Sequence, residues 1–192
     1  MNAMKRLRLL NKGGLFLAFG LFWISLNGFS QEVKLTRQER KEARKAELFA
    51  NFHILDSLFE SKSFVLEADY LENKYGDQIP VSSMVNFIMV NSTNGVLQTG
   101  NTSSIGYNGL GGVTAEGSIG TWKLNRDYKN LNFTLRFSIL TDIGSYDVLM
   151  TVNAGNYARA TITGIWPGKL IYSGHLNRLD GSGVYKGQRT VI

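Results

Sequence analysis

The sequence offers a small pool of acid–base side chains from which a hydrolytic site could be assembled. The pool consists of Glu67, Asp69, Tyr107, His175 and Asp180. Paired carboxylates perform glycoside hydrolysis, but acid–base catalysis needs groups that converge on one substrate atom. Glu67 and Asp69 are two positions apart, a spacing that is common on a solvated strand face. We therefore predict that the protein is not an enzyme, and we keep an envelope hydrolase with dispersed acid–base residues as the alternative.

The composition excludes several other chemistries. The chain has 192 residues and no Cys, which excludes a disulfide scaffold, a zinc ribbon, a thiol catalyst and an iron–sulfur site. Its two histidines, His53 and His175, are too few for a histidine-rich metal site. We expect no metal, no cofactor and no catalytic residue.

A glycine-rich segment over residues 106–120 has some features of a nucleotide-binding loop. It reads GYNGLGGVTAEGSIG, but it lacks the Lys-Ser or Lys-Thr pair of a P-loop and the βαβ context of a dinucleotide site. We interpret its glycines as allowing positive φ angles and close backbone approach in a tight hairpin or bulge. Because loops often carry binding residues, Tyr107 and Asn108 are our candidates for the rim of a ligand site.

The first 30 residues have the three-part layout of a secretory signal peptide. A basic start is followed by an uncharged apolar run over residues 13–26, which is shorter than the roughly 20 residues that cross a membrane. The small residues Gly28 and Ser30 predict cleavage between Ser30 and Gln31. We therefore expect a periplasmic or secreted protein with no transmembrane helix after cleavage.

Cleavage would also change the charge of the protein. The whole chain has 21 basic and 15 acidic residues, a net charge of +6, and residues 1–30 hold four of the basic residues and no acidic ones. The mature chain then has 17 basic and 15 acidic residues, a net charge of +2. This near balance gives no electrostatic reason to expect a nucleic acid partner.

Residues 31–62 predict a helix that is charged in its first half and amphipathic in its second. Thr36 and Glu39 match a capping box, and we place the helix from about Arg37 to Ser61. Its apolar stripe has the spacing of one helix face. The stripe consists of Leu48, Phe52, Leu55 and Phe59, widened by Phe49 and Leu58.

Residues 63–192 predict an antiparallel β domain, because the apolar period changes to two after Lys62. Phe64, Leu66, Ala68 and Tyr70 form one buried strand face, and Asn94-Gly95 is a strong hairpin signal. About eight strands with no helix between them indicate a β-sandwich or an up-and-down barrel. The length would also allow a small outer-membrane barrel, but too few strands alternate strongly enough for one.

Four segments in combination resemble a known family. They are SKSFVLEA at 61–68, NFI at 86–88, GYNGLGGVT at 106–114 and VYKG at 184–187. Over roughly Leu48 to Gly187 the chain resembles small secreted or lipid-anchored proteins of the Bacteroidota that are catalogued as a domain of unknown function. The resemblance implies a bacterial envelope location and a mostly β domain, and it implies no activity. A lipid anchor is not carried over, since the chain has no Cys.

Together these features predict an exported, non-catalytic envelope binding or interaction protein. We expect its partner to be either a small apolar ligand, held inside the β domain if that domain closes as a barrel, or another envelope protein.

Overall fold

The computed structural model describes residues 36–100, 112–164 and 168–190. The predicted signal peptide with its Ser30–Gln31 cleavage site lies outside these described residues, as do Tyr107 and Asn108. The chain divides into two compact units, Met1–Glu42 and Ala43–Ile192.

The α-helix α2 runs from Arg37 to Ser61, as predicted. It begins with the expected capping box. The backbone N–H of Thr36 donates to the Glu39 carboxylate at 2.7 Å, and the backbone N–H of Glu39 donates to the Thr36 hydroxyl at 3.3 Å. The hydrogen bonds with Thr36 lower the pKa of Glu39, and the bond with the Thr36 backbone has the largest effect. Among the described residues, no helix combines the length and the apolar character needed to cross a membrane.

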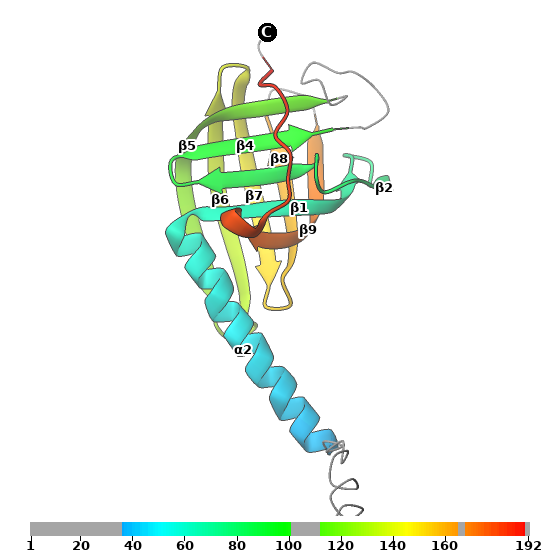
Figure 1. The fold of residues 1–192 in the computed structure, drawn as a ribbon, viewed down its shortest axis with the longest axis vertical. Helices are drawn as coiled ribbons and strands as arrows, with labels where there is room; N and C mark the ends of the chain where they lie inside the picture. The colour runs from blue at the N-terminus through cyan, green and yellow to red at the C-terminus, as the bar shows by residue number, and fades with distance from the viewer. Residues whose placement is uncertain (1–35, 101–111, 165–167, 191–192) are drawn as a thin grey trace, which may run out of the picture. The chain divides into compact units, whose positions relative to one another are not determined.

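Within the described residues nine strands follow the helix, and eight of them close into an antiparallel barrel (Figure 1). The strands are β1 (Ser63–Glu72), β2 (Gln78–Pro80), β3 (Phe87–Asn91), β4 (Asn94–Thr99), β5 (Val113–Asp127), β6 (Asn132–Thr141), β7 (Gly144–Asn153), β8 (Tyr157–Thr163) and β9 (Lys169–Arg178). Each strand from β3 to β8 pairs with the next strand along the chain, and β1 pairs with both β3 and β9. The closing β1–β9 ladder selects the barrel over the sandwich, because it leaves no free edge around the ring. The short β2 pairs with the second half of β1.

The barrel interior is apolar because successive side chains of a strand point to opposite faces. In β6 the inward residues Phe133, Leu135, Phe137 and Ile139 are all buried, whereas Arg136 between them is exposed. β7 and β8 show the same alternation.

The second half of α2 packs against one end of the barrel. Its buried residues are Phe52, Leu55, Leu58 and Phe59. The Phe52 ring stacks on Phe133 at the start of β6, with ring centroids 4.3 Å apart. Phe59 makes an edge contact with Phe64 at the start of β1, with centroids 5.4 Å apart. The helix therefore contacts the end of the barrel at which β1 and β6 begin.

The buried face of α2 is narrower than predicted. The sequence pattern places Phe49 in the stripe, but its side chain is 42% exposed, and the Lys45 ammonium group lies 5.9 Å from its ring centroid. Around the helix axis Leu58 lies on one side of the buried face and Phe49 lies on the opposite side, where the helix meets solvent.

An ion cluster also joins α2 to the barrel. Arg126 near the end of β5 contacts the carboxylates of Asp56, at 2.7 Å, and of Glu60. The hydrogen bond to Asp56 is the main reason why the pKa of Arg126 is raised. Since Arg126 and Asp56 are both about three-quarters buried, the contact fixes the helix on this end of the barrel.

Tyr70 faces outward, in contrast to the prediction. In the β1–β9 ladder Ala68 pairs with Gly174 and Tyr70 pairs with Ser173, so that Asp69 is the extra residue of a β-bulge. A bulge shifts the phase of the alternation by one residue. The next buried side chain is therefore that of Leu71.

The predicted hairpin exists, but its turn lies two residues earlier. Asn91 pairs with Asn94, which leaves Ser92 and Thr93 as the turn, and Ser92 has a φ of +56°. Gly95 instead belongs to β4. A Cβ atom at Gly95 would lie 2.7 Å from the Cδ1 atom of Ile119, so close packing against this side chain, rather than the turn, favours glycine here.

The C-terminal segment over residues 182–190, which we call the C-terminal strap, runs across the outside of the sheet (Figure 1). The backbone N–H of Tyr185 donates to Met84 at 2.7 Å, and that of Thr190 donates to Thr114 at 3.0 Å. Lys186 pairs with Glu116 at 2.9 Å.

The side chain of Gln98 in β4 anchors this strap. Gln98 is fully buried, and its amide NH2 donates to the carbonyl oxygens of Val85, at 3.2 Å, and Tyr185, at 2.9 Å. Its amide oxygen accepts from the Thr114 hydroxyl at 2.9 Å and from the Gly187 N–H at 2.8 Å. All four hydrogen-bonding positions of this buried amide are therefore used.

Candidate ligand-binding site

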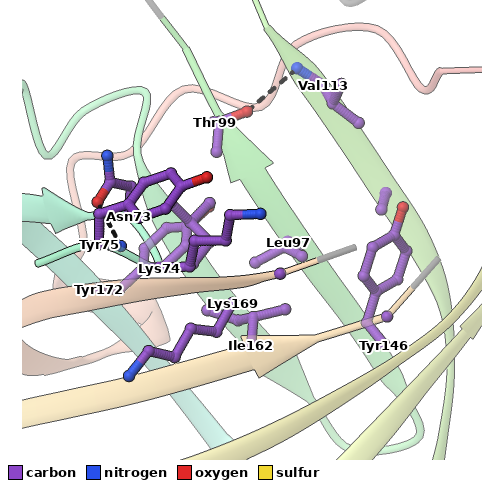
Figure 2. Close-up of a pocket in the computed structure, with 14 residues that line it drawn as sticks. Asn73, Lys74, Tyr75, Leu97, Thr99, Val113, Tyr146, Ile162, Lys169 and Tyr172 are labelled. Carbon is purple, nitrogen blue, oxygen red and sulfur yellow. Dashed lines mark hydrogen bonds between the residues drawn. The ribbon is translucent and has the colours of Figure 1, made fainter. Parts of the chain in front are cut away.

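A cavity of about 260 Å³ lies at one end of the barrel, and Figure 2 shows residues that line it. Its walls come from the ends of β4 and β8, the starts of β5, β7 and β9, and the turn between β1 and β2. The helix contacts the opposite end of the barrel, where β1 and β6 begin and β5 ends. One end of the barrel is thus covered by α2, and the other end contains the cavity.

The inner wall of the cavity is mainly apolar. Its deepest lining residues are buried in the structure and come from five strands. They are Leu97, Ala115, Tyr146, Ile162 and Tyr172. An apolar wall with few polar groups is typical of sites that hold small organic ligands.

Tyr172 crosses the barrel interior at this wall. Its hydroxyl donates a hydrogen bond of 3.0 Å to the backbone carbonyl oxygen of Gln98. Burial, with a smaller effect of Tyr146, raises the pKa of Tyr172, and burial also raises the pKa of Tyr146. Both phenols therefore stay neutral at physiological pH, and the inner wall carries no charge.

The turn between β1 and β2 forms part of the cavity mouth and is held by its own hydrogen bonds. The Asn73 side-chain oxygen accepts from the backbone N–H groups of Tyr75, at 2.9 Å, and Asp77, at 3.0 Å. The Asn73 side-chain NH2 donates to the Asp77 carboxylate at 2.8 Å. Gly76 takes a φ of +94°, which favours glycine. The turn therefore presents Lys74 and Tyr75 to the cavity from a fixed backbone.

Two lysines give the mouth a positive charge. Lys74 and Lys169 both line the cavity, and their side chains extend in different directions (Figure 2). The Lys74 ammonium group lies 5.0 Å from the ring centroid of Tyr75. Across the described ranges no carboxylate lies within ion-pair distance of either lysine, and no Asp or Glu lines the cavity.

The predicted ligand rim is not tested. Tyr107 and Asn108 lie outside the described residues, between Gly100 and Gly112. Thr99 and Val113, at the ends of the described strands on either side, line the cavity, and the Val113 N–H donates to the Thr99 hydroxyl at 3.3 Å (Figure 2). The assignment of Tyr107 and Asn108 therefore stays a prediction.

The acid–base pool does not gather at the cavity. Asp69 and His175 form a pair, with Oδ2 and Nδ1 2.9 Å apart, but both side chains are about half exposed. Glu67 accepts a hydrogen bond of 2.6 Å from the Ser182 hydroxyl. Asp180 contacts Arg178 at 3.1 Å, and that contact lowers the pKa of Asp180. None of these four pool members lines the cavity.

The described residues contain no group of three or more His, Asp or Glu side chains that could hold a metal ion. His53 is exposed on α2, far along the chain from His175.

Sequence reasoning did not single out Lys74, Tyr146 or Tyr172 as site residues. Tyr172 carries a usable signal, since it is an aromatic residue in a short apolar run, residues 170–172, of the predicted β domain. Lys74 carries none, because a lysine in a polar turn is ordinary until the cavity beside it is known.

The geometry defines a small antiparallel β-barrel with a helix over one end and a cavity in the other. Residues 46–176 match the sequence model of the family described as "Domain of unknown function (DUF4251)", and the chain belongs to this family. This confirms the resemblance to a domain of unknown function that the sequence motifs indicated.

A solved relative supports the same fold. The crystal structure of a DUF4251 family protein from Bacteroides eggerthii DSM 20697 is 32% identical in sequence, with a TM-score of 0.58. The similarity covers 69% of this chain and 91% of that chain. No curated protein matches the chain.

Proposed function

We propose that this protein is an exported, non-catalytic binding protein of the bacterial envelope that holds a small apolar ligand in the barrel cavity. The observation that carries the proposal is the mostly apolar cavity of about 260 Å³ inside a closed barrel. Because a water molecule occupies about 30 Å³ in the liquid, the cavity has room for about nine groups of water or methylene size. This volume fits a short hydrocarbon chain or a small ring system.

Calorimetric titration with 1-octanol tests ligand binding. We expect saturable binding to the folded mature protein, and its loss in Ala115→Leu, because Ala115 is buried in the cavity wall. Ala46→Leu is the matched control, since it makes the same change at an exposed helix position. Absence of 1-octanol binding to the wild-type protein, or unchanged binding by a folded Ala115→Leu variant, would contradict the proposal.

Export is supported by the basic start, the apolar run and the small residues before Gln31, and the relative from Bacteroides eggerthii supports a bacterial source. Mass spectrometry of protein from a bacterial periplasmic extract tests it. We expect a mature chain that starts at Gln31, and accumulation of the uncleaved chain when Gly28 and Ser30 are both replaced by Arg. A mature product that retains residues 1–30 would contradict this part.

A hydrolase is the second candidate, because Asp69 and His175 are in direct contact and a carboxylate can orient a histidine for base catalysis. Their exposure and their separation from the cavity favour binding without catalysis. Hydrolysis of p-nitrophenyl esters and glycosides by the purified protein is the test. Turnover that disappears in both Asp69→Asn and His175→Ala would replace the non-catalytic proposal with a hydrolase.

A further inference from the structure

The cavity combines an uncharged apolar interior with a cationic mouth. The interior is lined by side chains such as Leu97, Ala115 and Ile162, whereas Lys74 and Lys169 are the charged residues that line the cavity in the described part of the chain. The two internal segments outside the described residues, 101–111 and 165–167, contain no Asp or Glu that could neutralise these lysines. A bound molecule would therefore meet hydrocarbon inside and positive charge at the entrance.

Lys74 is positioned for a role in recognition. It follows Asn73, whose side chain holds the turn in place. Its aliphatic stem packs against Gly168, where an added Cβ atom would lie 3.2 Å from the Lys74 Cδ atom. Gly168 has a φ of +145°, a backbone conformation that side chains rarely allow. The Lys74 stem thus has close contact on one side, and its ammonium group lies near Tyr75 with no carboxylate within ion-pair distance among the described residues.

We propose that the cavity selects a short-chain anionic amphiphile, a monocarboxylate of about eight carbons, whose chain occupies the interior and whose carboxylate pairs with Lys74 at the mouth. This inference rests on the proposed ligand-binding function and adds the chemical class of the ligand. The chain length follows from the cavity volume, since room for about nine methylene-sized groups excludes the two long chains of a phospholipid. The sign of the head group follows from the charge at the mouth.

The test compares three ligands with one chain length and different head groups: octanoate, 1-octanol and octyltrimethylammonium. We expect octanoate to bind about tenfold more tightly than the cationic analogue, because the mouth attracts one charge and repels the other. High salt should weaken octanoate binding and leave 1-octanol binding unchanged, since a pair at the mouth is screened by salt. Palmitate should bind more weakly than octanoate, because its chain exceeds the cavity.

Two lysine variants test whether Lys74 makes the contact with the head group. Lys74→Gln should weaken octanoate binding about fivefold, the size expected for a partly exposed ion pair, and should change 1-octanol binding by less than about twofold. Lys129→Gln is the matched control, because Lys129 is exposed in the turn between β5 and β6, near the helix-covered end. Thermal unfolding of each variant confirms that it is folded.

The outcomes separate this inference from the function on which it rests. If 1-octanol binds but octanoate and octyltrimethylammonium bind equally well, the head-group inference is wrong and the apolar cavity proposal stands. An equal effect of Lys74→Gln and Lys129→Gln on octanoate also overturns the role of Lys74. If none of the three ligands binds, both proposals are wrong.

Discussion

The hydroxyl group of Tyr172 in β9 donates a 3.0 Å hydrogen bond to the backbone carbonyl oxygen of Gln98 in β4. These strands are not neighbours in the barrel, so the bond links two separated parts of the wall across the interior. On the outside of the same wall, the Gln98 side chain binds the C-terminal strap. Gln98 thus connects the cavity wall to the end of the chain.

Removal of the Tyr172 hydroxyl should destabilise the fold. In Tyr172→Phe the buried carbonyl oxygen of Gln98 loses this donor, which should lower the free energy of unfolding by about 1–3 kcal/mol. Tyr157→Phe, at a half-exposed position of β8, should change it by less than about 0.5 kcal/mol. Urea unfolding of both variants measures the difference, and equal effects would show that the hydrogen bond across the barrel contributes nothing.

Stability should fall at alkaline pH. A tyrosine in the unfolded chain ionises near pH 10, whereas burial raises the pKa of Tyr172 and of Tyr146 in the folded protein. The unfolded state then releases protons that the folded state keeps, so stability is fully present below about pH 10 and is lost as the pH rises above it.

The Tyr172→Phe variant also tests this pH dependence. The variant lacks one of the groups with a raised pKa. Its free energy of unfolding should therefore fall less steeply with rising pH than that of the wild type, and the two slopes should differ by about 1.4 kcal/mol per pH unit. Urea unfolding from neutral pH to about pH 11 gives both curves. Parallel curves would contradict the assignment of the alkaline loss to Tyr172.

Phe52 should anchor α2, in contrast to Phe49 one turn earlier. Phe52 is 1% exposed and stacks on Phe133, so Phe52→Ala should lower the free energy of unfolding by about 3–5 kcal/mol. Phe49→Ala should change it by less than about 0.5 kcal/mol. Chemical unfolding of the two variants makes the comparison, and similar losses would mean that the helix does not dock through the observed face.

The C-terminal strap should loosen when the Gln98 amide is removed. Gln98→Met keeps a similar volume but leaves the Tyr185 carbonyl oxygen and the Gly187 N–H without their present partner. We expect a loss of about 1–3 kcal/mol in stability and faster tryptic cleavage after Lys186 and Arg189. Gln38→Met, at an exposed helix position, is the control, and an unchanged cleavage rate in Gln98→Met would contradict the anchoring role.

Closure of the barrel should depend on Gly174. A Cβ atom at Gly174 would overlap the backbone carbonyl oxygen of Glu67 in the β1–β9 ladder. Gly174→Ala should therefore destabilise the protein by about 1–3 kcal/mol or more, whereas Gly181→Ala, with nothing within 4 Å, should be nearly neutral. Thermal unfolding compares the two, and a neutral Gly174→Ala would show that the ladder adapts without strain.

The sequence by itself determined the local elements. The capping box at Thr36 and Glu39 places the helix start, and the change from a helical period to a period of two places the start of the β domain after Lys62. These features depend on neighbours within a few residues, so a linear pattern is enough to reveal them. The alternation in β6 likewise identifies Phe133 and Leu135 as interior residues, because the two faces of a strand are fixed by its pleat.

Only the tertiary structure decided which strand edges meet and what lies between them. The choice of barrel over sandwich depends on the pairing of β1 with β9, about a hundred residues apart in the chain, and no local pattern encodes such a long-range pairing. The bulge at Asp69 and the inward position of Gly95 follow from packing against those partners. The cavity brings Lys74 from a turn together with Tyr172 from the last strand, and their proximity is a consequence of barrel closure rather than of their spacing in the sequence.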